Sequence, residues 1–283
     1  MTREEFRARA RRGLLLDGAN GSNLMAAGMP RGVSTEDWVL EHPDVFQTLQ
    51  RCFAAAGSEL VYAPTFTGNR VYRKGPVAEL NRRLVAVSRA AVGALPVAGD
   101  VTTVGRPDLP YEEMLDIYGE QIGALCEAGV DAIVIETMMG QQECLAALEA
   151  ARSCCELPVL CSFSVSADGM LYFGGSVLET ARDLEALGAD AVGVNCSCGP
   201  DQLVSVVRNL RDAVSLPIIA KPNAGMPVID EKTGQAVYPM GPEAFARSMR
   251  ALMEAGATVV GGCCGTTPEH IAALRQVKEE VLG

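Results

Sequence analysis

Short apolar runs alternate with amphipathic stretches along the whole sequence, and this alternation restricts the fold more than any other feature. Each run has the length of a buried strand, and the stretches between them carry apolar residues at helical spacing, as residues 111–128 do. Strands that alternate with helices build parallel sheets from βα units. The eight candidate strands are Leu14–Asp17, Glu59–Ala63, Pro96–Asp100, Ala132–Glu136, Pro158–Phe163, Ala191–Asn195, Pro217–Lys221 and Ala257–Gly261.

Two kinds of helix-ending signal precede these strands, and they alternate from one strand to the next. The second, fourth, sixth and eighth strands follow a helical stretch that ends in glycine, the residue that most readily forms a left-handed helix C-cap. The third, fifth and seventh strands follow a Leu-Pro pair, in which proline stops the helix and is tolerated at the first residue of a strand. The glycines are Gly57, Gly129, Gly188 and Gly256, and the prolines are Pro96, Pro158 and Pro217.

Eight βα units in 283 residues predict an α/β protein of the (β/α)8 TIM barrel class, a fold that usually takes about 250 residues. We expect a single domain over residues 1–283. An open doubly wound sheet is the alternative, although such a sheet rarely has eight strands in one unbroken alternation. Residues 1–12 are expected to form a helix that leads into the first strand, because Thr2 and Glu5 have the spacing of a capping box.

Composition excludes some classes of partner and of location. The formal net charge of −11 argues against a nucleic acid or an anionic membrane, because both require a basic surface. No apolar run approaches the roughly 18 residues of a transmembrane helix. The N-terminal arginines are not followed by the apolar segment of a secretion signal. With ten cysteines and no such signal, we expect a cytoplasmic protein with reduced thiols.

Most of the cysteines lie in predicted helices or at helix ends, where we interpret them as small core residues. Cys161 lies in a predicted strand, and its role stays open. The cysteines interpreted as core residues are Cys52, Cys126, Cys144, Cys154 and Cys155.

Two adjacent cysteines, Cys263 and Cys264, stand between glycines directly after the last predicted strand. Neighbouring cysteines do not easily form a disulfide with each other, because the geometry of the bond requires converging Cβ atoms. Two thiolates in one tight turn suit a soft metal, and Cys196 at the end of the sixth strand offers a third. We therefore predict a zinc site with an open fourth position, as in catalytic zinc sites. The alternatives are a turn with buried thiols, and Cys198 in place of Cys196.

Polar side chains gather where the predicted strands end. In a barrel of parallel strands these ends share one face, the face on which barrel enzymes have their sites. Two loops on that face, residues 18–41 and 222–240, are long enough to indicate function, and Lys232-Thr233-Gly234 predicts a hairpin turn in the second. The polar residues at or just past the strand ends are Asp17, Thr65, Asp100, Glu136, Ser162, Asn195 and Lys221.

Three thiolates give a zinc centre a net charge of −1, which makes it a poor Lewis acid toward water. Such a centre can still hold an incoming thiol as thiolate near pH 7, below the ordinary thiol pKa of about 8.5. The chemistry indicated is alkyl transfer to sulfur. Asp17 and Glu136 could hold the ammonium group of an amino-acid substrate, and backbone N–H groups of Gly18–Gly21 its carboxylate. Alternatively, Asp17 caps a turn and Glu136 belongs to an ion pair inside the barrel.

The motifs at the strand ends resemble those of the zinc-dependent homocysteine S-methyltransferases over nearly the whole chain. The residues of these motifs are most similar to those of the homocysteine-binding domain at the N-terminus of cobalamin-dependent methionine synthase. The segment that includes Cys263 and Cys264 is the longest and most specific. The motifs are Leu16–Ser22, Thr65-Phe66, Ile135–Thr137, Gly193–Ser197, Lys221–Gly225 and Gly261–Ile271.

The resemblance implies a (β/α)8 barrel, zinc on Cys196, Cys263 and Cys264, and methyl transfer to L-homocysteine to give methionine. It also implies that homocysteine binds zinc through sulfur, with its amino group near the acids. We accordingly expect substrate contacts from Asp17, Gly18, Thr65, Glu136, Asn195 and Asn223.

The sequence departs from the family pattern in two places, and the second, in a loop expected to face the methyl donor, leaves the donor open. The first motif ends in Gly21-Ser22 where the family usually has Gly-Thr, and residues 99–103 differ from the usual end of the third strand. The expected donor is methylcobalamin on a separate corrinoid protein, since no folate or cobalamin module is found, or a small methylated onium compound. Two alternatives remain: another small thiol or selenol as acceptor, and a non-catalytic zinc-binding subunit that docks a corrinoid protein.

Overall fold

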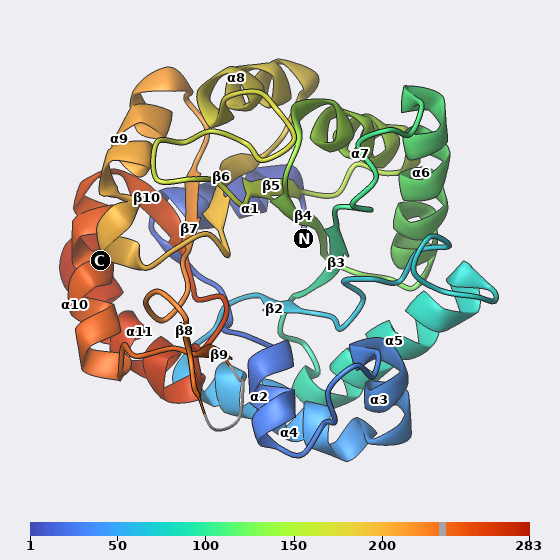
Figure 1. Ribbon diagram of the computed structural model, residues 1–283, viewed down its shortest axis with the longest axis horizontal. Helices are drawn as coiled ribbons and strands as arrows, with labels where there is room; N and C mark the ends of the chain where they lie inside the picture. The colour runs from blue at the N-terminus through green and yellow to red at the C-terminus, as the bar shows by residue number, and fades with distance from the viewer. Residues whose placement is uncertain (232–235) are drawn as a thin grey trace.

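A computed structural model describes residues 1–231 and 236–283 of the chain. Eight parallel strands lie at its centre in the order β1-β10-β7-β6-β5-β4-β3-β2 (Figure 1). A parallel bridge between Leu16 and Leu60 joins the first strand to the second and closes the circle. The predicted (β/α)8 barrel is confirmed. The strands are β1 (Leu14–Leu15), β2 (Val61–Tyr62), β3 (Val97–Thr102), β4 (Ala132–Met138), β5 (Val159–Phe163), β6 (Ala191–Asn195), β7 (Ile218–Lys221) and β10 (Ala257–Val260).

Helices surround the barrel (Figure 1). Gly57 and Gly188 cap their helices in the left-handed conformation, as the sequence predicts. Because each helix ends near the start of the following strand, the loops after the strands all reach the opposite face. The outer helices are α4 (Pro43–Ala56), α5 (Val77–Val92), α6 (Tyr111–Glu127), α7 (Gln141–Cys154), α8 (Val177–Leu187), α9 (Val204–Ala213), α10 (Pro242–Glu254) and α11 (Pro268–Leu282), with a 3-10 turn, η1 (Pro200–Gln202), before α9.

The N-terminal helix α1 (Arg3–Arg11) covers the end of the barrel where the strands begin. Its capping box of Thr2 and Glu5 is present, as predicted. Phe6 and Ala10 are fully buried and pack with side chains inside the barrel. This end of the barrel is therefore closed by apolar contacts.

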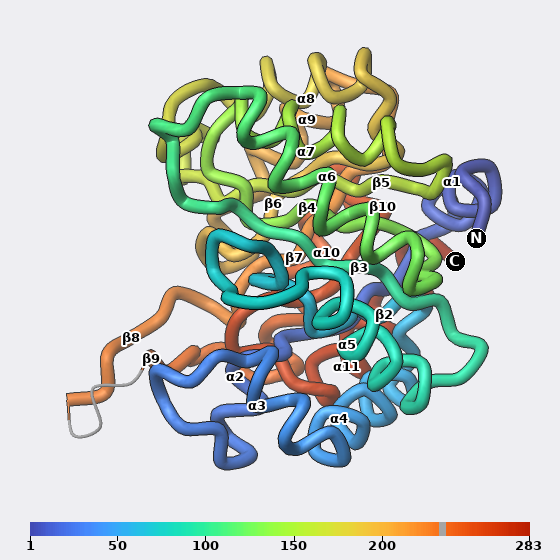
Figure 2. Tube along the Cα trace, turned by 90° about the vertical axis from the view of Figure 1, so that its right-hand side faces the viewer, coloured from blue at the N-terminus to red at the C-terminus, as the bar shows by residue number. Residues whose placement is uncertain are grey.

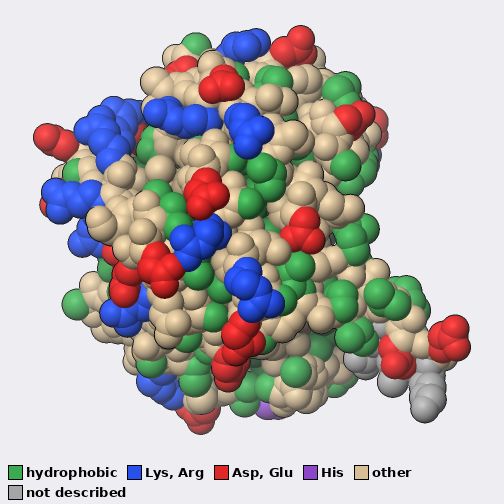
Figure 3. Space-filling view, turned by 90° about the vertical axis from the view of Figure 1, so that its left-hand side faces the viewer, with side chains coloured by type: hydrophobic (Ala, Val, Ile, Leu, Met, Phe, Trp, Pro, Cys, Tyr) green, Lys and Arg blue, Asp and Glu red, His purple; other side chains and the backbone are tan. Residues whose placement is uncertain are grey.

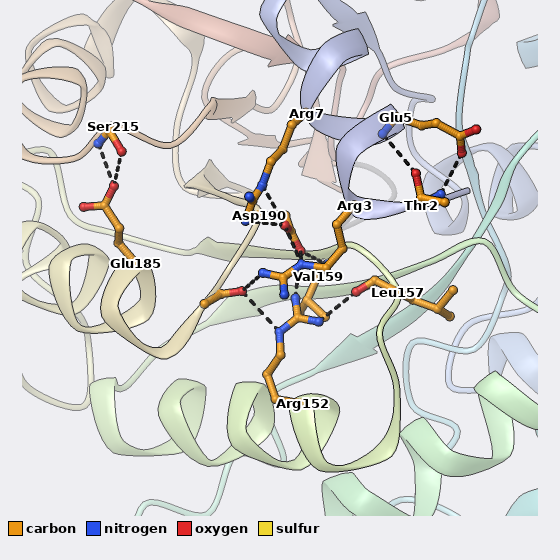
Figure 4. Close-up of polar contacts among 11 residues, drawn as sticks. Thr2, Arg3, Glu5, Arg7, Arg152, Leu157, Val159, Glu185, Asp190 and Ser215 are labelled. Carbon is orange, nitrogen blue, oxygen red and sulfur yellow. Dashed lines mark hydrogen bonds and ion pairs between the residues drawn. The ribbon is translucent and has the colours of Figure 1, made fainter.

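Asp190 joins α1 to the barrel through three arginines (Figure 4). Its side chain is fully buried, and its carboxylate oxygens lie 2.9 Å from Arg3 Nε, 2.9 Å from Arg7 Nη2 and 2.7 Å from Arg152 Nη2. A buried carboxylate is tolerated only when it is paired and hydrogen-bonded. The cluster thus fixes α1 against the loop that precedes β6.

The two long loops on the opposite face contain structure of their own. Residues 18–41 form two short helices, α2 (Gly21–Ala26) and α3 (Thr35–Glu41), so helical structure begins earlier than the sequence pattern indicated. Ser34 caps α3 by accepting from the N–H of Asp37. The later loop forms an antiparallel pair, β8 (Val228–Ile229) and β9 (Ala236–Val237), which projects from the body (Figures 2 and 3). The turn predicted at Lys232-Thr233-Gly234 lies outside the described residues.

Burial corrects part of the interpretation of the cysteines. Cys144 is buried, as predicted for a core residue, and so is Cys161. Cys52 and Cys154 are exposed, so their assignment to the core was wrong: both lie on helices, on the side that faces solvent. Helical spacing alone does not tell which side of an outer helix a small residue occupies. No helix in the described parts of the chain is long and apolar enough to cross a membrane.

Candidate metal centre and substrate cavity

Cys196, Cys263 and Cys264 come together at the open face of the barrel. Their sulfur atoms all lie within 4.8 Å of one another, and the Sγ atoms of Cys196 and Cys264 are 3.5 Å apart. Sulfurs bound at about 2.3 Å in a tetrahedron around zinc lie about 3.8 Å from each other. The three thiols therefore fit a metal ion of this size. Cys198 is buried and stands outside this group.

The backbone around the thiols explains the glycines of the last motif. The N–H of Cys263 donates to the carbonyl of Pro222, and the carbonyl of Cys264 accepts from the N–H of Ala224. A Cβ on Gly262 would lie 2.4 Å from Thr266, and Gly265 has a φ of +81°. Only glycine fits both places, so the turn holds its two cysteines against the loop after β7.

Cys196 also has an unusual backbone, with a φ of 45°. Its carbonyl accepts from the hydroxyl of Ser164 at 3.0 Å, and its N–H donates to the carbonyl of Lys221 at 3.3 Å. A non-glycine residue in the left-handed region is strained and is held there by its surroundings. Here the strain turns the thiol toward the other two.

Hydrogen bonds among the three thiols and the hydroxyl of Tyr238 shift the pKa values of these groups. Hydrogen bonds from Cys196 and Cys263, and then one from Tyr238, lower the pKa of Cys264 to about 3, although burial opposes the shift. Hydrogen bonding to Cys196 and Cys264 raises the pKa of Cys263. Burial, and then the charge of Cys264, raises the pKa of Tyr238. One thiolate is therefore favoured in the cluster even without a metal ion. Tyr238 follows β9, and no sequence signal pointed to it.

The three cysteines line a cavity of about 870 Å³ at the open face. Its other walls come from the loops after β1, β2 and β7 and from the ends of β3 and β4. Of the residues expected to contact substrate, Gly18 and Glu136 line this cavity, whereas Asp17, Thr65, Asn195 and Asn223 do not. Further polar lining residues are Asn20, Ser22, Arg31, Ser34, Thr35, Glu36, Tyr62, Thr67, Asp100, Thr137, Lys221 and Tyr238.

Asp17 is engaged within the barrel. It is fully buried, its Oδ1 lies 3.2 Å from Lys221 Nζ, and its Oδ2 accepts from the N–H of Tyr62 at 2.8 Å. The same ammonium group lies 3.7 Å from the centre of the Tyr62 ring and 4.0 Å from Oε2 of Glu136. Lys221 therefore supplies the positive charge beside these acids, and Arg31 is a second cation in the wall of the cavity. The sequence placed it at a strand end but not among the site residues.

Glu136 and Asp100 are the acids of the cavity wall that can still accept a hydrogen bond. Oε2 of Glu136 and Oδ1 of Asp100 are buried without a hydrogen-bond partner, and both residues line the cavity. Burial raises the pKa of Glu136 to about 7, and burial followed by the charge of Glu136 raises the pKa of Asp100. Two unsatisfied acids beside a cavity can accept an ammonium group. Asp100 was noted at a strand end, and nothing in the sequence distinguished it from Asp17.

Thr65 and Asn195 form hydrogen bonds to neighbouring strands of the barrel. The hydroxyl of Thr65 donates to the carbonyl of Asp100 and accepts from its N–H, both at 2.9 Å. The amide of Asn195 accepts from the N–H of Thr137 at 2.9 Å and donates to its hydroxyl at 2.8 Å. Thr137 has a φ of 59°, so Asn195 holds the strained end of β4. Oδ1 of the buried Asn223 has no partner.

A sequence model of the family described as homocysteine S-methyltransferase matches residues 14–278. The methionine synthases of Mycobacterium leprae and Mycobacterium tuberculosis are 28% and 29% identical to the chain, over 93% of its length. The match covers 24% of each of them, so the chain spans about a quarter of the length of these curated relatives.

Solved structures agree with the fold. The homocysteine methyltransferase MmuM of Escherichia coli, in its oxidised form, superposes with a TM-score of 0.80 over 94% of this chain and 96% of that chain, at 23% identity. The metallated form of the same protein gives a TM-score of 0.80, covers 93% and 95%, and has the same identity. With a family match over most of its length and this shared barrel, the chain belongs to the homocysteine S-methyltransferase family.

Proposed function

We propose that the chain transfers a methyl group to the sulfur of L-homocysteine and forms methionine, with zinc on Cys196, Cys263 and Cys264. The observation that carries this proposal is the sulfur cluster, with all three atoms within 4.8 Å of one another, on the wall of a cavity that also contains the carboxyl groups of Asp100 and Glu136. Thiols for a metal and acids for an ammonium group are what a thiol-bearing amino acid requires.

The donor set suits zinc, which prefers thiolate sulfur and leaves a fourth position for substrate when only three protein ligands are present. When bound, zinc would lower the pKa of the substrate thiol and hold it as a thiolate near neutral pH. Tyr238 contributes by donating its hydroxyl hydrogen to Cys264, which spreads the negative charge of the cluster.

The amino group of the substrate is bound by Glu136 and Asp100. Three carboxyl groups, those of Asp17, Asp100 and Glu136, surround the single ammonium group of Lys221. Lys221 pairs most closely with Asp17, so the remaining acids have room for one more cation. The ammonium group of homocysteine would supply that charge and satisfy the unpartnered oxygens.

The reaction requires no general base from the chain. Zinc held by the three cysteines would supply the release of the thiol proton, because a sulfur ligand binds as thiolate. The sulfur then attacks the methyl carbon in line, the new S–C bond forms, and the carrier leaves with the electron pair of the bond that breaks. The two carboxylates orient the amino acid so that its sulfur faces the cavity opening.

The proposal also includes the identity of the methyl donor. We favour a methylcorrinoid carried by a separate protein, because the relatives are methionine synthases, with a small methylated onium compound as second choice. We place the reaction in reducing cytosol because all ten cysteines are free thiols, Cys52 and Cys154 among them at the surface.

The test combines zinc content with methionine formation. Methylcobalamin, S-methylmethionine, betaine and methyltetrahydrofolate are each offered with homocysteine, and Cys263→Ala serves as the control. Turnover with one donor, lost together with zinc in the variant, establishes the reaction. A wild-type protein that binds no zinc under reducing conditions contradicts the proposal. Zinc without turnover on any free donor favours a subunit that acts only with a corrinoid protein.

A second comparison tests the acceptor. Substrate analogues that lack the amino or the carboxylate group are offered as competing thiols. Equal turnover of homocysteine and the analogue without an amino group would point to a different small thiol or selenol as the natural acceptor.

A further inference from the structure

Tyr238, in the wall of the cavity, lies against the turn that carries the two adjacent cysteines. A Cβ on Gly265 would lie 2.3 Å from both Cβ and Cγ of Tyr238, far inside the usual distance of about 3.5–4.0 Å between carbon atoms. The base of the tyrosine therefore rests on the backbone directly after Cys264. Tyr238 and Cys264 both line the cavity. Whatever fixes Tyr238 in this place thus affects the surroundings of a predicted metal ligand.

The hairpin that leads to Tyr238 is poorly placed to fix it. Tyr238 directly follows β9, and the pair of β8 and β9 projects from the body of the molecule (Figure 2). The exposed fractions of Val228, Ile229 and Val237 are 59%, 63% and 50%. A single short pair of exposed strands is only marginally stable. The fixed point is therefore to be sought in the residues after Tyr238.

Met240, two residues after Tyr238, is held from both sides. Its N–H donates to the carbonyl of Ala224 at 3.0 Å, and its carbonyl accepts from Nε2 of His270 at 2.9 Å. Ala224 in turn donates its N–H to the carbonyl of Cys264 at 2.9 Å. Met240 therefore connects His270 to the sulfur turn through one intervening residue.

His270 uses both nitrogens of its ring. It is the third residue of α11, the position at which a capping box usually has Glu or Gln, and its Nδ1 accepts from the N–H of Thr267 at 3.2 Å. Because Nδ1 accepts, the hydrogen of the neutral ring is on Nε2, which donates it to Met240. The ring is buried and meets the ring of Phe245 edge to face, with 5.6 Å between the centroids. One side chain thus caps α11 and holds Met240.

We propose that His270 is a positioning residue of the metal centre: by holding Met240, it sets where Tyr238 lies in the cavity wall. Pro239 is the only residue between Tyr238 and Met240, and its ring fixes its φ, so a displacement of Met240 is passed on to the tyrosine. The inference rests on the proposed function for its kinetic consequence, since the Tyr238 hydroxyl there donates to Cys264. Its structural part concerns the position of a side chain and is tested without substrate.

The first measurement uses the unmodified full chain, isolated under reducing conditions. The chain has two histidines, His42 and His270, so a nitrogen NMR spectrum of the isotope-labelled protein contains two imidazole rings, and His42→Gln identifies them. We expect His270 to be the neutral tautomer with its hydrogen on Nε2. A ring without a hydrogen on Nε2 would overturn the proposal, because it could not donate to Met240.

The second measurement follows Tyr238 itself by fluorine NMR of the chain labelled with fluorotyrosine. The resonance that is missing in Tyr238→Phe belongs to Tyr238. His270→Asn keeps an acceptor near the place of Nδ1 but has no donor at the place of Nε2, whereas the amide of His270→Gln reaches that place. We expect the Tyr238 resonance to shift or broaden in His270→Asn and to have its wild-type position in His270→Gln. Thr267→Val, which loses only the hydroxyl of the capping box, should leave the resonance unchanged.

A double-mutant cycle connects the position of Tyr238 to the reaction. His270→Asn and Tyr238→Phe should each lower kcat/KM for methionine formation about tenfold, the loss expected for one hydrogen bond to a charged group. The double variant should lose no more than either single variant, because both changes remove the same contact. His270→Gln should retain most of the wild-type kcat/KM. Losses that multiply in the double variant would overturn the proposal, since His270 would then act by another route.

Two results of the fluorine measurement would also overturn it. One is a Tyr238 resonance in His270→Asn that matches the wild type. The other is an equal displacement in Thr267→Val, which would assign the effect to the cap of α11. If the wild type binds no zinc or forms no methionine, the proposed function fails, but the two spectra still decide the role of His270. Far-ultraviolet circular dichroism shows whether His270→Asn is folded, and if it is not, the nitrogen spectrum of the unmodified chain decides.

Discussion

The ammonium group of Lys221 lies 3.2 Å from the carboxylate of Asp17, and both side chains are almost completely removed from solvent. The two residues come from β7 and from the end of the first strand, and the pair lies across the interior of the barrel. Burial favours the neutral forms of both groups, whereas their mutual attraction favours the charged forms. The pair is therefore part of the framework beneath the cavity, and each residue depends on the other.

The first prediction concerns this pair. Asp17→Asn leaves the Lys221 charge without its closest partner, so the free energy of unfolding should fall by about 3 kcal/mol, as when one member of a buried pair is removed. Urea unfolding measures this loss. Glu136→Gln is the control and should lose much less, because Oε2 of Glu136 has no hydrogen bond to lose. Equal losses of unfolding free energy in the two variants would contradict the interpretation that Asp17, and not Glu136, is the structural partner of Lys221.

Glu136→Gln should instead impair substrate binding. Loss of one charged hydrogen bond to the amino group should raise KM for homocysteine by about 10- to 100-fold, with a smaller change in kcat. Steady-state kinetics with the donor in excess measures both. The analogue without an amino group should have the same KM with wild type and variant. If the KM of this analogue also rises in the variant, Glu136 affects the shape of the cavity and does not bind the amino group.

The pH profile provides a separate test of Glu136. Burial raises the pKa of this carboxyl group to about 7, so it is charged above that pH and neutral below it. As the pH falls through 7, the attraction for the substrate ammonium is lost, and kcat/KM should decrease. In Glu136→Gln this acid limb should be absent, because glutamine does not titrate. An unchanged acid limb in the variant would assign it to another group.

Zinc content should distinguish neighbouring cysteines. Cys196→Ser removes one of the three clustered sulfurs, so zinc that survives dialysis against a weak chelator should fall from about one ion per chain to a small fraction of that. Cys198→Ser is a matched control only two residues away, buried and outside the cluster, and should keep its zinc. Zinc loss in the second variant alone would show that the ligand set is wrong.

Asp190 offers a prediction about stability alone. Asp190→Asn removes the negative charge that three arginines share, and the free energy of unfolding should fall by about 3 kcal/mol. Arg7→Ala should cost about 1 kcal/mol or less, because Arg7 is partly exposed and two other arginines remain. Activity per folded molecule should be unchanged in both. A change in KM would mean that the cluster affects the distant cavity.

Much of the fold follows from local chemistry. Gly188 ends one helix, Pro217 stops another, and short apolar runs fit only buried strands. Cys196, Cys263 and Cys264 could be grouped from sequence because parallel strands all end on one face. Each of these inferences depends on residue type and position along the chain, and both can be read directly.

The side-chain partners inside the site could not be read in this way. Asp17, Asp100 and Glu136 all end strands, but only the packed barrel decides that Asp17 meets Lys221 while the other two face the cavity. Tyr238 reaches Cys264 from a hairpin whose direction no local pattern specifies. Exposure of Cys52 likewise depends on which side of α4 meets the barrel.

Every described residue that lines the cavity comes from one end of the barrel, and α1 closes the other end with apolar contacts. Under the proposed function, the amino acid and its methyl donor would therefore share a single approach. The amino acid would bind beside Glu136 and would have to arrive before a bulky methyl carrier covered the opening, and methionine would leave only after that carrier had withdrawn. A fixed order of binding and release would thus follow from a short helix on the far side of the molecule.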